Sequence, residues 1–450
     1  CSSDLSPYRA YMITKEENEL LCRVENGAPM GKLMRQHWVP ICLSEEVAET
    51  DGDPVTAKIL GENLVVFRDS DGQVGVLDEA CPHRGPSLSY GRNEEGGLRC
   101  LYHGWKFDVH GNVMEMVSEP ASSGFMEKVK HKAYPVKEWG GMIWAWMGDQ
   151  DNMPEFVPPR WAPTADTRVS IAKAILPVNW AQVLEGAIDS AHSSSLHSSD
   201  MVPARVHGAE ATDKNWLRPS TDKAPRLQIQ KDGYGFRYAA IRRPIFDAQS
   251  HDYVRTTVFV APWTVLIPPN NLYNVANVNV PIDDENMVFY FIGWGHPSQT
   301  PETATWRKFL HLSVGPDLDD RYRLLRNHEN RFGQDRQAMK AGNFTGIKGI
   351  PNQDMAMWLT MGRLVDRTRD RLGASDLAVV EFRKQMIAAV NDVANGNAAI
   401  GTGENSVPNT INSFQRVIPK EQDWRSYPAQ PVWAGDEVQA GTDDNYTVKG

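Results

Sequence analysis

The feature that most constrains the fold is a pair of short segments, each with one cysteine and one histidine. The stretch CPHRGPSLSYGRNEEGGLRCLYH contains Cys81 and His83 in the first segment and Cys100 and His103 in the second, with sixteen residues between His83 and Cys100. Cysteine and histidine side chains at these spacings are typical metal ligands, and all four converge only if two loops meet. The surrounding chain must therefore form a unit that brings both loops together.

Two kinds of metal site accept two cysteines and two histidines. A Rieske [2Fe–2S] cluster has both cysteines on one iron and both histidines on the other. Structural zinc sites of this composition usually pair Cys with Cys and His with His along the sequence. Each segment here is mixed, which favours the Rieske cluster. Gly85, Gly91 and Gly104 allow close backbone approach, and amide N–H groups directed at the sulfurs would tune the cluster's potential.

The cluster segments lie within a predicted all-β domain, residues 38–150. Gly-Asp, Ser-Asp-Gly and His-Gly-Asn turns there separate runs of β-branched and aromatic residues. Residues 1–37 are expected to comprise an N-terminal extension and a helical region, from residue 12, that packs on the later, C-terminal domain (residues 151–450). The polar, Pro-rich segment DQDNMPEFVPP marks the end of the β domain.

Residues 151–450 are predicted to form an α+β domain. Strand-like segments such as VSIAKAILPV and YVRTTVFVAPWTVLIP alternate with helix-like ones such as NWAQVLEGAIDSAH and DLAVVEFRKQMIAAVNDVANG. This pattern predicts a mostly antiparallel sheet covered by helices, a helix-grip-like arrangement. From Asn397 the composition turns to Gly, Asn and Pro, and we expect an extended tail over a surface.

The bulk composition excludes several classes of protein. The chain has 450 residues, enough for two or three domains, and its 14 tryptophans support substantial cores. The net charge of −10 is spread along the sequence, which argues against nucleic-acid or anionic-membrane partners. No apolar run approaches the roughly 18 residues that span a bilayer. Five dispersed cysteines predict a reducing cytoplasm rather than a disulfide framework. Residues 1–11 are expected to be an extension without function.

A second motif, EGAIDSAHSSSLHSSD, contains Asp189, His192 and His197. On a regular helix Asp189 and His192 share a face, but His197 lies five positions further on, about 140° round the helix. A regular helix cannot direct both imidazoles at one point. We therefore expect either a π-type turn or a break in the Ser193–Ser195 run. From these residues alone, two surface histidines at a serine-rich helix end remain an alternative.

The segments CPHRG and CLYHGWKFDVHGN resemble the Rieske domain of the aromatic ring-hydroxylating oxygenases. Cytochrome bc-type Rieske proteins carry an extra cysteine in each cluster loop, where this chain has Pro86 and Leu101-Tyr102. The family's D-x-x-H-x₄-H motif is matched by Asp189, His192 and His197. The resemblance implies that the two histidines, with one carboxylate, hold a mononuclear Fe(II) with an open face for O₂.

The third iron ligand implied by the resemblance is Asp354. It lies in GIPNQDMAMWLTMGRLVDRTRDRLGASD, which is similar to a signature of the phthalate dioxygenase type of oxygenase. Pro351 and Asn352 can start a helix that presents Asp354 on its first turn. Three other aspartates in the segment compete for this role: Asp366, Asp370 and Asp376.

The resemblance gives Asp189 a catalytic role without ligation of iron. It implies that Asp189 joins a Rieske histidine of one subunit to an iron histidine of its neighbour, which requires a homotrimer or a hexamer of two stacked trimers. Support of its own subunit's iron site is the alternative. Asn179 and Glu185 are predicted to support the iron site from the preceding helix, whereas Trp180 is expected to pack in the core.

Oxygenases of this type act largely on aromatic acids, which directs attention to arginine. Arg255 shares a strand face with Thr257 and Phe259, and a charge in mid-strand is costly unless it meets an anion. Arg218, in the predicted loop NWLRPSTD, and Ser190 are the other predicted substrate-binding residues. Three further arginines remain candidates: Arg205, Arg242 and Arg243.

The resemblance implies a terminal oxygenase component that cis-dihydroxylates an aromatic carboxylic acid, with phthalate at positions 4 and 5 as the expected substrate. Electrons from NADH would arrive through a separate flavin and iron–sulfur reductase, since the chain has no G-x-G-x-x-G motif or flavin domain. Two alternatives stay open. One is a dioxygenase or O-demethylating monooxygenase of another aromatic acid, such as a halobenzoate, phenoxybenzoate or vanillate-like compound. The other is a Rieske electron carrier.

Overall fold

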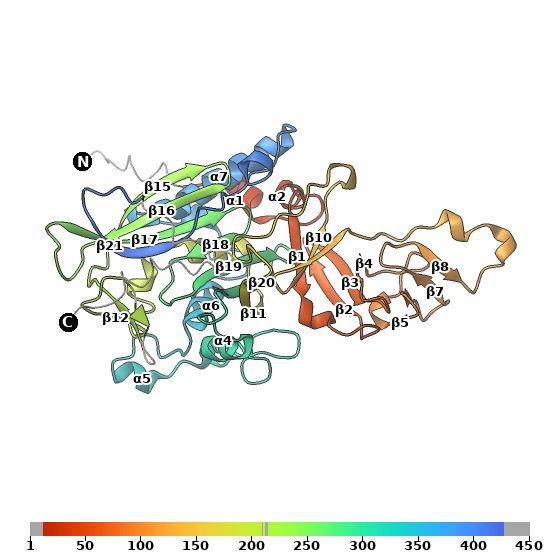
Figure 1. Cartoon of the computed structure of the whole chain (residues 1–450), viewed down its shortest axis with the longest axis horizontal. Helices are drawn as coiled ribbons and strands as arrows, with labels where there is room; N and C mark the ends of the chain where they lie inside the picture. The colour runs from red at the N-terminus through yellow and green to blue at the C-terminus, as the bar shows by residue number, and fades with distance from the viewer. Residues whose placement is uncertain (1–11, 209, 212–214, 427–450) are drawn as a thin grey trace. The chain divides into compact units, whose positions relative to one another are not determined.

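The computed structural model describes residues 12–208, 210–211 and 215–426 (Figure 1). They divide into two compact units. The smaller unit comprises Arg23–Val157 and Val280–Asp283, and the larger one comprises the remaining residues. The region 12–37, predicted as helical, contributes to both units. Its helices α1 and α2 are separated at Asn26 and Gly27, which both have positive φ.

The smaller unit is built from antiparallel strands. Two sheets have three strands, in the orders β1-β10-β9 and β2-β3-β4, and a third has the order β5-β6-β7-β8. This confirms the predicted all-β fold. The elements are α2 (Pro29–Met34), β1 (Trp38–Leu43), β2 (Val55–Ile59), β3 (Glu62–Arg68), β4 (Val74–Asp78), β5 (Arg92–Glu94), β6 (Gly97–Arg99), β7 (Trp105–Phe107), β8 (Val113–Met116), β9 (Val136–Trp139) and β10 (Met142–Trp146).

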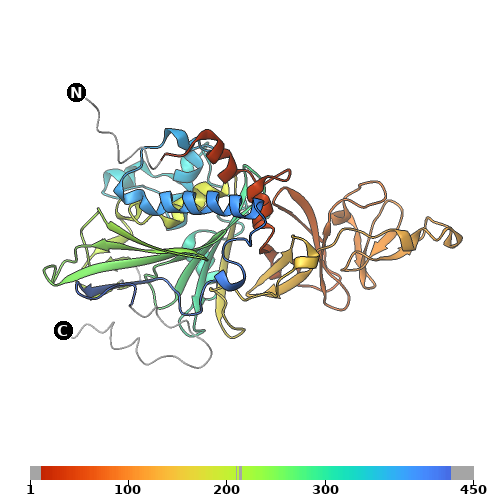
Figure 2. The same ribbon diagram turned by 90° about the horizontal axis from the view of Figure 1, so that it is seen from above.

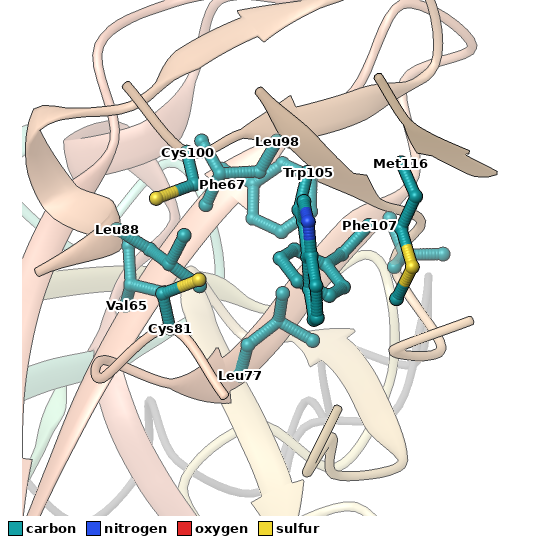
Figure 3. Packing of buried hydrophobic residues seen from close by; sticks show 11 residues of the cluster. Val65, Phe67, Leu77, Cys81, Leu88, Leu98, Cys100, Trp105, Phe107 and Met116 are labelled. Atoms are coloured by element: carbon teal, nitrogen blue, oxygen red, sulfur yellow. The ribbon is translucent and has the colours of Figure 1, made fainter. Parts of the chain in front are cut away.

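The core of this unit lies beneath the cysteine-containing loops (Figure 3). Strand alternation directs Trp105 and Phe107 of β7 into the core, where both are almost completely buried. Lys106, between them, instead pairs with Glu95 at 3.2 Å and Glu115 at 3.2 Å. Each buried large apolar side chain contributes about 1.5–3 kcal/mol relative to exposure, so the two aromatic side chains anchor the loop that precedes them.

The larger unit is organised around an eight-stranded sheet of order β11-β20-β19-β18-β17-β16-β15, with β21 also paired to β17. A small sheet contains β12, β14 and β13. The strands are β11 (Arg168–Leu176), β12 (Met201–Pro203), β13 (Glu210–Ala211), β14 (Trp216–Arg218), β15 (Arg226–Asp232), β16 (Gly235–Arg242), β17 (His251–Val260), β18 (Thr264–Ile267), β19 (Asn274–Pro281), β20 (Met287–Gly295) and β21 (Phe414–Pro419).

Helices cover this sheet, and the predicted α+β class is confirmed. Helix α7 lies along β15 and β16, and α3 contacts β17 and β18 (Figure 2). The Phe382 ring joins the layers, since it lies 5.9 Å from Trp180 and 5.3 Å from Phe259 between ring centroids. Trp180 is fully buried, as expected for core packing. The helices are α1 (Lys15–Cys22), α3 (Trp180–Ile188), α4 (Thr303–Leu310), α5 (Arg336–Lys340), α6 (Ile350–Thr360) and α7 (Leu377–Ala394).

The C-terminal part of the described chain forms a strand. Strand β21 pairs with His251–Thr256 of β17, and Phe414 is 2% exposed. This part of the chain therefore differs from the surface tail that its Gly, Asn and Pro content predicts.

Across the described residues, no helix combines the length and apolar character needed to span a bilayer.

Candidate metal centres and substrate pocket

Each of the two cysteine-containing loops contains the same type of backbone turn. Gly85 N–H donates to Cys81 O at 2.8 Å, and Gly104 N–H donates to Cys100 O at 3.0 Å. Both glycines have positive φ, +81° and +73°, a conformation that L side chains rarely adopt. Each turn thus reverses the chain directly after its cysteine and histidine, which turns both side chains to the same end of the unit.

The four predicted cluster ligands lie at these turns as two pairs, the histidines together and the cysteines together. The rings of His83 and His103 lie 4.3 Å apart between centroids, and His83 stacks on Trp105 at 4.5 Å. Cys81 and Cys100 are buried, free of disulfides and located at one edge of the core cluster (Figure 3). The two turns therefore contribute one pair of thiols and one pair of imidazoles.

Two observations indicate that this set fits a cluster. The buried His83 Nδ1 has no hydrogen-bond partner among the described residues, an arrangement that normally costs about 1–3 kcal/mol. Burial raises the pKa of the Cys81 thiol to about 11, so its thiolate needs a nearby cation. A [2Fe–2S] cluster held by Cys81, Cys100, His83 and His103 would satisfy both groups.

The second motif folds around an early helix end. Helix α3 stops at Ile188, and Asp189 follows with extended backbone angles, φ −84° and ψ 116°. The Asp189 carboxylate accepts a 2.7 Å hydrogen bond from Ala191 N–H, which competes with continued helix. A 3₁₀ turn, His192–Ser194, comes next. The predicted π-type turn or break within Ser193–Ser195 is therefore wrong, since the break occurs at Asp189.

The irregular backbone brings His192, His197 and Asp354 together. Asp354 Oδ1 lies 3.4 Å from His192 Nε2 and 3.2 Å from His197 Nε2. One potential ligand atom from each residue lies within 4.8 Å of the other two. We call these three residues the triad. Two imidazoles and one carboxylate are the donors of mononuclear non-haem Fe(II) sites, so the triad fits such an ion.

Asp354 reaches the histidines because α3 and α6 approach closely. A Cβ on Gly186 of α3 would lie only 2.1 Å from Trp358 Nε1 of α6. Helix α6 starts with Pro351 in its first turn, as expected, and Asp354 follows one turn later. The three competing aspartates lie elsewhere: Asp366 accepts from Thr368 N–H, Asp370 pairs with Arg383 and Asp376 accepts from Gly373 N–H.

Asp189 supports the triad through His192. Its Oδ2 lies 3.3 Å from His192 Nδ1, on the opposite side of the ring from Asp354. Burial opposes protonation of His192, but the hydrogen bond with Asp189 and the charge of Asp354 outweigh it and raise the pKa of His192. Burial likewise disfavours the Asp189 carboxylate, yet its bond to His192 holds the pKa of Asp189 below the usual value. Asp189 thus orients His192 toward Asp354.

A pocket lies beside the triad. The triad, Asp189 and Ser190 line one part of it, and Arg255, Asn270 and Asn277 add polar groups. The rest is mainly apolar, with five aromatic side chains: Trp216, Phe289, Phe291, Trp306 and Trp358. Such a lining suits a flat ring with a small number of polar substituents.

Three buried arginines without an acidic partner lie in or behind the wall of this pocket: Arg255 lines it, whereas Arg218 and Arg242 contact the lining residues Ser193 and Ser190. Arg218, Arg242 and Arg255 are 5%, 2% and 5% exposed, and none forms a salt bridge within the described part of the chain. Arg255 lines the pocket and donates to Gln415 Oε1 at 2.6 Å. Burial, together with repulsion from Arg255 and Arg242, lowers the pKa of Arg218 to about 9. Uncompensated buried cations are costly, so the site favours an anion.

The other candidate substrate residues fall into two groups. Arg218 donates to Ser193 Oγ at 2.9 Å, and Arg242 donates to Ser190 O at 2.8 Å and to Ser190 Oγ at 3.3 Å. Both guanidiniums therefore hold the turn that carries His192. Arg205 and Arg243 are exposed, so their charges are solvated.

Asn179 and Glu185 form their hydrogen bonds and ion pairs away from the triad. Asn179 accepts from Ala181 N–H as the N-cap of α3 and donates to Cys22 O at 3.0 Å. Glu185 Oε1 lies 2.7 Å from Arg367 Nε and 2.8 Å from Arg383 Nε. Their predicted support of the iron site is thus not direct. Instead, both residues hold the helix from which Asp189 extends.

Sequence reasoning missed Gln353 and Asp200. Gln353 Oε1 lies 2.8 Å from His197 Nδ1, and Gln353 Nε2 donates to Asp200 Oδ2 at 2.9 Å. The available signal was the position of Gln353, a polar residue in the first turn of α6 directly before Asp354.

Comparison with known proteins agrees with this pair of sites. The Rieske [2Fe-2S] domain model matches residues 37–135, and the LigXa C-terminal domain-like model matches residues 145–449. The chain belongs to the Rieske non-haem iron oxygenases, in the family of the phthalate 4,5-dioxygenase oxygenase subunits. This family implies a Rieske cluster and a mononuclear iron, for which the four cluster residues and the triad provide matching donors.

The relatives fall into the same enzyme class. The chain is 67% identical to the phthalate 4,5-dioxygenase oxygenase subunit of Pseudomonas putida, over 97% of this chain and 100% of the relative. It is 35% identical to the 3-chlorobenzoate-3,4-dioxygenase oxygenase subunit of Comamonas testosteroni, over 92% and 98%. A solved oxygenase of carbazole 1,9a-dioxygenase, in complex with ferredoxin, shares the fold, with TM-score 0.52, 22% identity and coverage of 87% and 97%.

Proposed function

We propose that the chain is the terminal oxygenase component that cis-dihydroxylates phthalate at positions 4 and 5. The observation that carries this proposal is Arg255, a buried arginine without an acidic partner in an aromatic-walled pocket at the triad; two further such arginines, Arg218 and Arg242, lie directly behind the pocket-lining Ser193 and Ser190. Two carboxylates on one ring would offset much of this charge. The 67% identical relative is named as a phthalate 4,5-dioxygenase subunit, which agrees with this substrate.

Substrate binding is assigned to Arg218, Arg255 and Ser190. Arginine stays charged when partly buried and pairs with a carboxylate through two parallel hydrogen bonds. Arg255 and Ser190 line the pocket, and Arg218 reaches its edge through Ser193. The aromatic walls then hold the ring and exclude water, while the carboxylates fix which ring edge faces His192, His197 and Asp354.

The two metal sites divide the chemistry. When bound, the cluster supplies single electrons and the iron of the triad activates O₂, so that both oxygen atoms enter the ring. The chain's own contribution is orientation: Asp189 holds His192 toward Asp354, and the buried pocket excludes bulk water. We propose that Asp189 also accepts a hydrogen bond from a cluster histidine of a neighbouring subunit, in a homotrimer or hexamer.

The partners follow from what the reaction consumes. Two electrons from NADH are needed per dihydroxylation, and we propose a separate flavin and iron–sulfur reductase as their source. Cys22, Cys81 and Cys100 are buried and form no disulfide within the described part of the chain, which supports a reducing cytoplasm as the compartment that we propose. We therefore assign the reaction to that compartment.

The test is product analysis under ¹⁸O₂. The purified chain, with NADH and a phthalate dioxygenase reductase, should convert phthalate to a cis-4,5-dihydrodiol that contains two labelled oxygen atoms. A product with one labelled atom would indicate a monooxygenase instead. Benzoate, 3-chlorobenzoate and vanillate serve as competing substrates, and faster turnover of any of them would reassign the substrate. Absence of O₂ uptake with all four would favour an electron carrier.

A further inference from the structure

A series of three hydrogen-bonded side chains lies behind His197, on the side of the ring away from Asp354. His197 Nδ1 is 2.8 Å from Gln353 Oε1, and Gln353 Nε2 donates to Asp200 Oδ2 at 2.9 Å. The second amide hydrogen of Gln353 goes to Ile347 O, also at 2.9 Å. His197 and Gln353 are 3% and 1% exposed, so water does not compete for these bonds.

The surroundings determine the orientation of the Gln353 amide. Asp200 Oδ2 and Ile347 O are both acceptors, and only an amide nitrogen can satisfy two acceptors at once. Rotation of the amide by 180° would place Oε1 against both oxygens and lose both hydrogen bonds. Gln353 Oε1 must therefore face His197 Nδ1.

This orientation decides which nitrogen of His197 carries the proton. A carbonyl-type oxygen cannot donate, so His197 Nδ1 must hold the hydrogen and donate it. Nε2 of the neutral ring then presents its lone pair on the side where Asp354 Oδ1 lies, 3.2 Å away. Metal binding through Nε2 needs this tautomer.

We propose that Gln353 and Asp200 are positioning residues that preset His197 for metal binding, with Asp200 acting through Gln353. This inference rests on the proposed iron site. The two histidines are thus supported differently. His192 faces the Asp189 carboxylate directly, whereas His197 faces a neutral amide that Asp200 orients from further away. The amide fixes the buried ring without placing another negative charge beside it.

The experiment measures the affinity of the mononuclear site in the cluster-loaded protein. That site is emptied with a chelator, the intact Rieske absorption is verified, and the protein is titrated anaerobically with Fe(II) and with Co(II). Gln353→Leu should weaken binding about 10- to 100-fold. Asp200→Ala should weaken it less, several-fold, because Ile347 O still holds one amide hydrogen. The double variant should match Gln353→Leu alone, because Asp200 acts only through Gln353.

The matched control is Gln182→Leu. Gln182 is another buried glutamine, which donates to Gly362 O at 2.9 Å and accepts from Val365 N–H at 2.8 Å. Its loss should leave the metal affinity unchanged. Equal weakening in Gln182→Leu and Gln353→Leu would show a general packing effect and overturn the proposal.

Two further outcomes separate this inference from the proposed function. If the wild-type chain binds no metal beyond the cluster, the iron site fails and the positioning role fails with it. If the wild type binds metal tightly and both Gln353→Leu and Asp200→Ala bind it equally well, the positioning role alone fails. Should Gln353→Leu not fold, Asp200→Ala decides the matter, because unchanged affinity in that variant overturns the role of Asp200.

Discussion

The cluster loops and the triad use opposite means to place metal ligands. The four cluster residues come from one stretch, residues 81–103, and two positive-φ glycine turns set their positions. The triad draws its ligands from the irregular segment after α3 and from α6, and side-chain hydrogen bonds set their positions: Asp189 on His192, and Gln353 on His197. The first site therefore depends on local backbone conformation, and the second depends on long-range packing.

This difference predicts which changes each site tolerates. Loss of the Glu185 ion pairs should weaken the larger unit and spare the cluster, whereas a Cβ added in a cluster turn should do the reverse.

His192→Ala should abolish hydroxylation, by about a thousandfold or more, because it removes one of three metal-binding side chains. The Rieske absorption and EPR signals should persist, since the cluster residues lie in the other compact unit. Turnover with a reductase, measured beside the visible spectrum, checks both statements. Hydroxylation retained in His192→Ala would show that the iron assignment is wrong.

Glu185→Gln should destabilise the larger unit by about 3–5 kcal/mol, because it leaves Arg367 and Arg383 buried without their shared carboxylate. Denaturant unfolding followed by far-UV circular dichroism measures this loss. The Rieske absorption should be lost at a denaturant concentration close to that of the wild type. If Glu185→Gln lowered the denaturant midpoints of both signals equally, the two metal sites would not have separate structural supports.

Glu185 should also make the stability of the larger unit depend on pH. Burial opposes ionisation of Glu185, but the two arginines outweigh it and hold the pKa of Glu185 below its usual value. Its contribution to stability is therefore full above the unfolded pKa, about 4.3, and is lost as the pH falls through the lower folded pKa. The stability difference between wild type and Glu185→Gln should accordingly shrink below that pH.

Arg255→Gln should raise KM for phthalate about 10- to 150-fold, because charge-assisted hydrogen bonds contribute about 1.5–3 kcal/mol. Turnover of benzoate should change less, since only one carboxylate needs a partner. Arg243→Gln is the control, because Arg243 is exposed and its charge is solvated. An equal rise in KM for both variants would argue against specific binding of the substrate carboxylate by Arg255.

Gly104→Ala should lower cluster occupancy several-fold. It combines φ +73° with a Cβ that would lie 2.4 Å from Val117 Cγ2. Gly85→Ala has a similar φ of +81° but no atom within 4 Å of the added Cβ, so its effect should be smaller. Visible absorbance per chain measures the occupancy, and equal losses would indicate that backbone strain alone matters.

The cluster residues and the fold class could be predicted because their signals are local. The mixed Cys–His spacing of Cys81, His83, Cys100 and His103 favours one metal group, and the turn sequences between runs of β-branched and aromatic residues predict strands. The choice of Asp354 required the family resemblance, because no local pattern separates it from Asp366, Asp370 or Asp376.

What escaped prediction depends on contacts between distant residues. The helix end at Asp189 follows from a carboxylate bond that competes with the helix, and Gln353 becomes informative only once α6 lies beside His197. Likewise, Arg242 donates to Ser190 O, a residue 52 positions earlier in the chain. Strand β21 forms because its backbone pairs with β17. Glu185 faces two arginines from a later segment rather than the triad.

The central claim is that one chain holds a two-iron cluster and a separate single iron at His192, His197 and Asp354. Iron and acid-labile sulfide, measured per chain in the wild type and in His192→Ala, test it most directly. The account predicts three irons with two sulfides in the wild type, and two irons with two sulfides in the variant. Two irons in the wild type, or a third iron retained after His192→Ala, would contradict it.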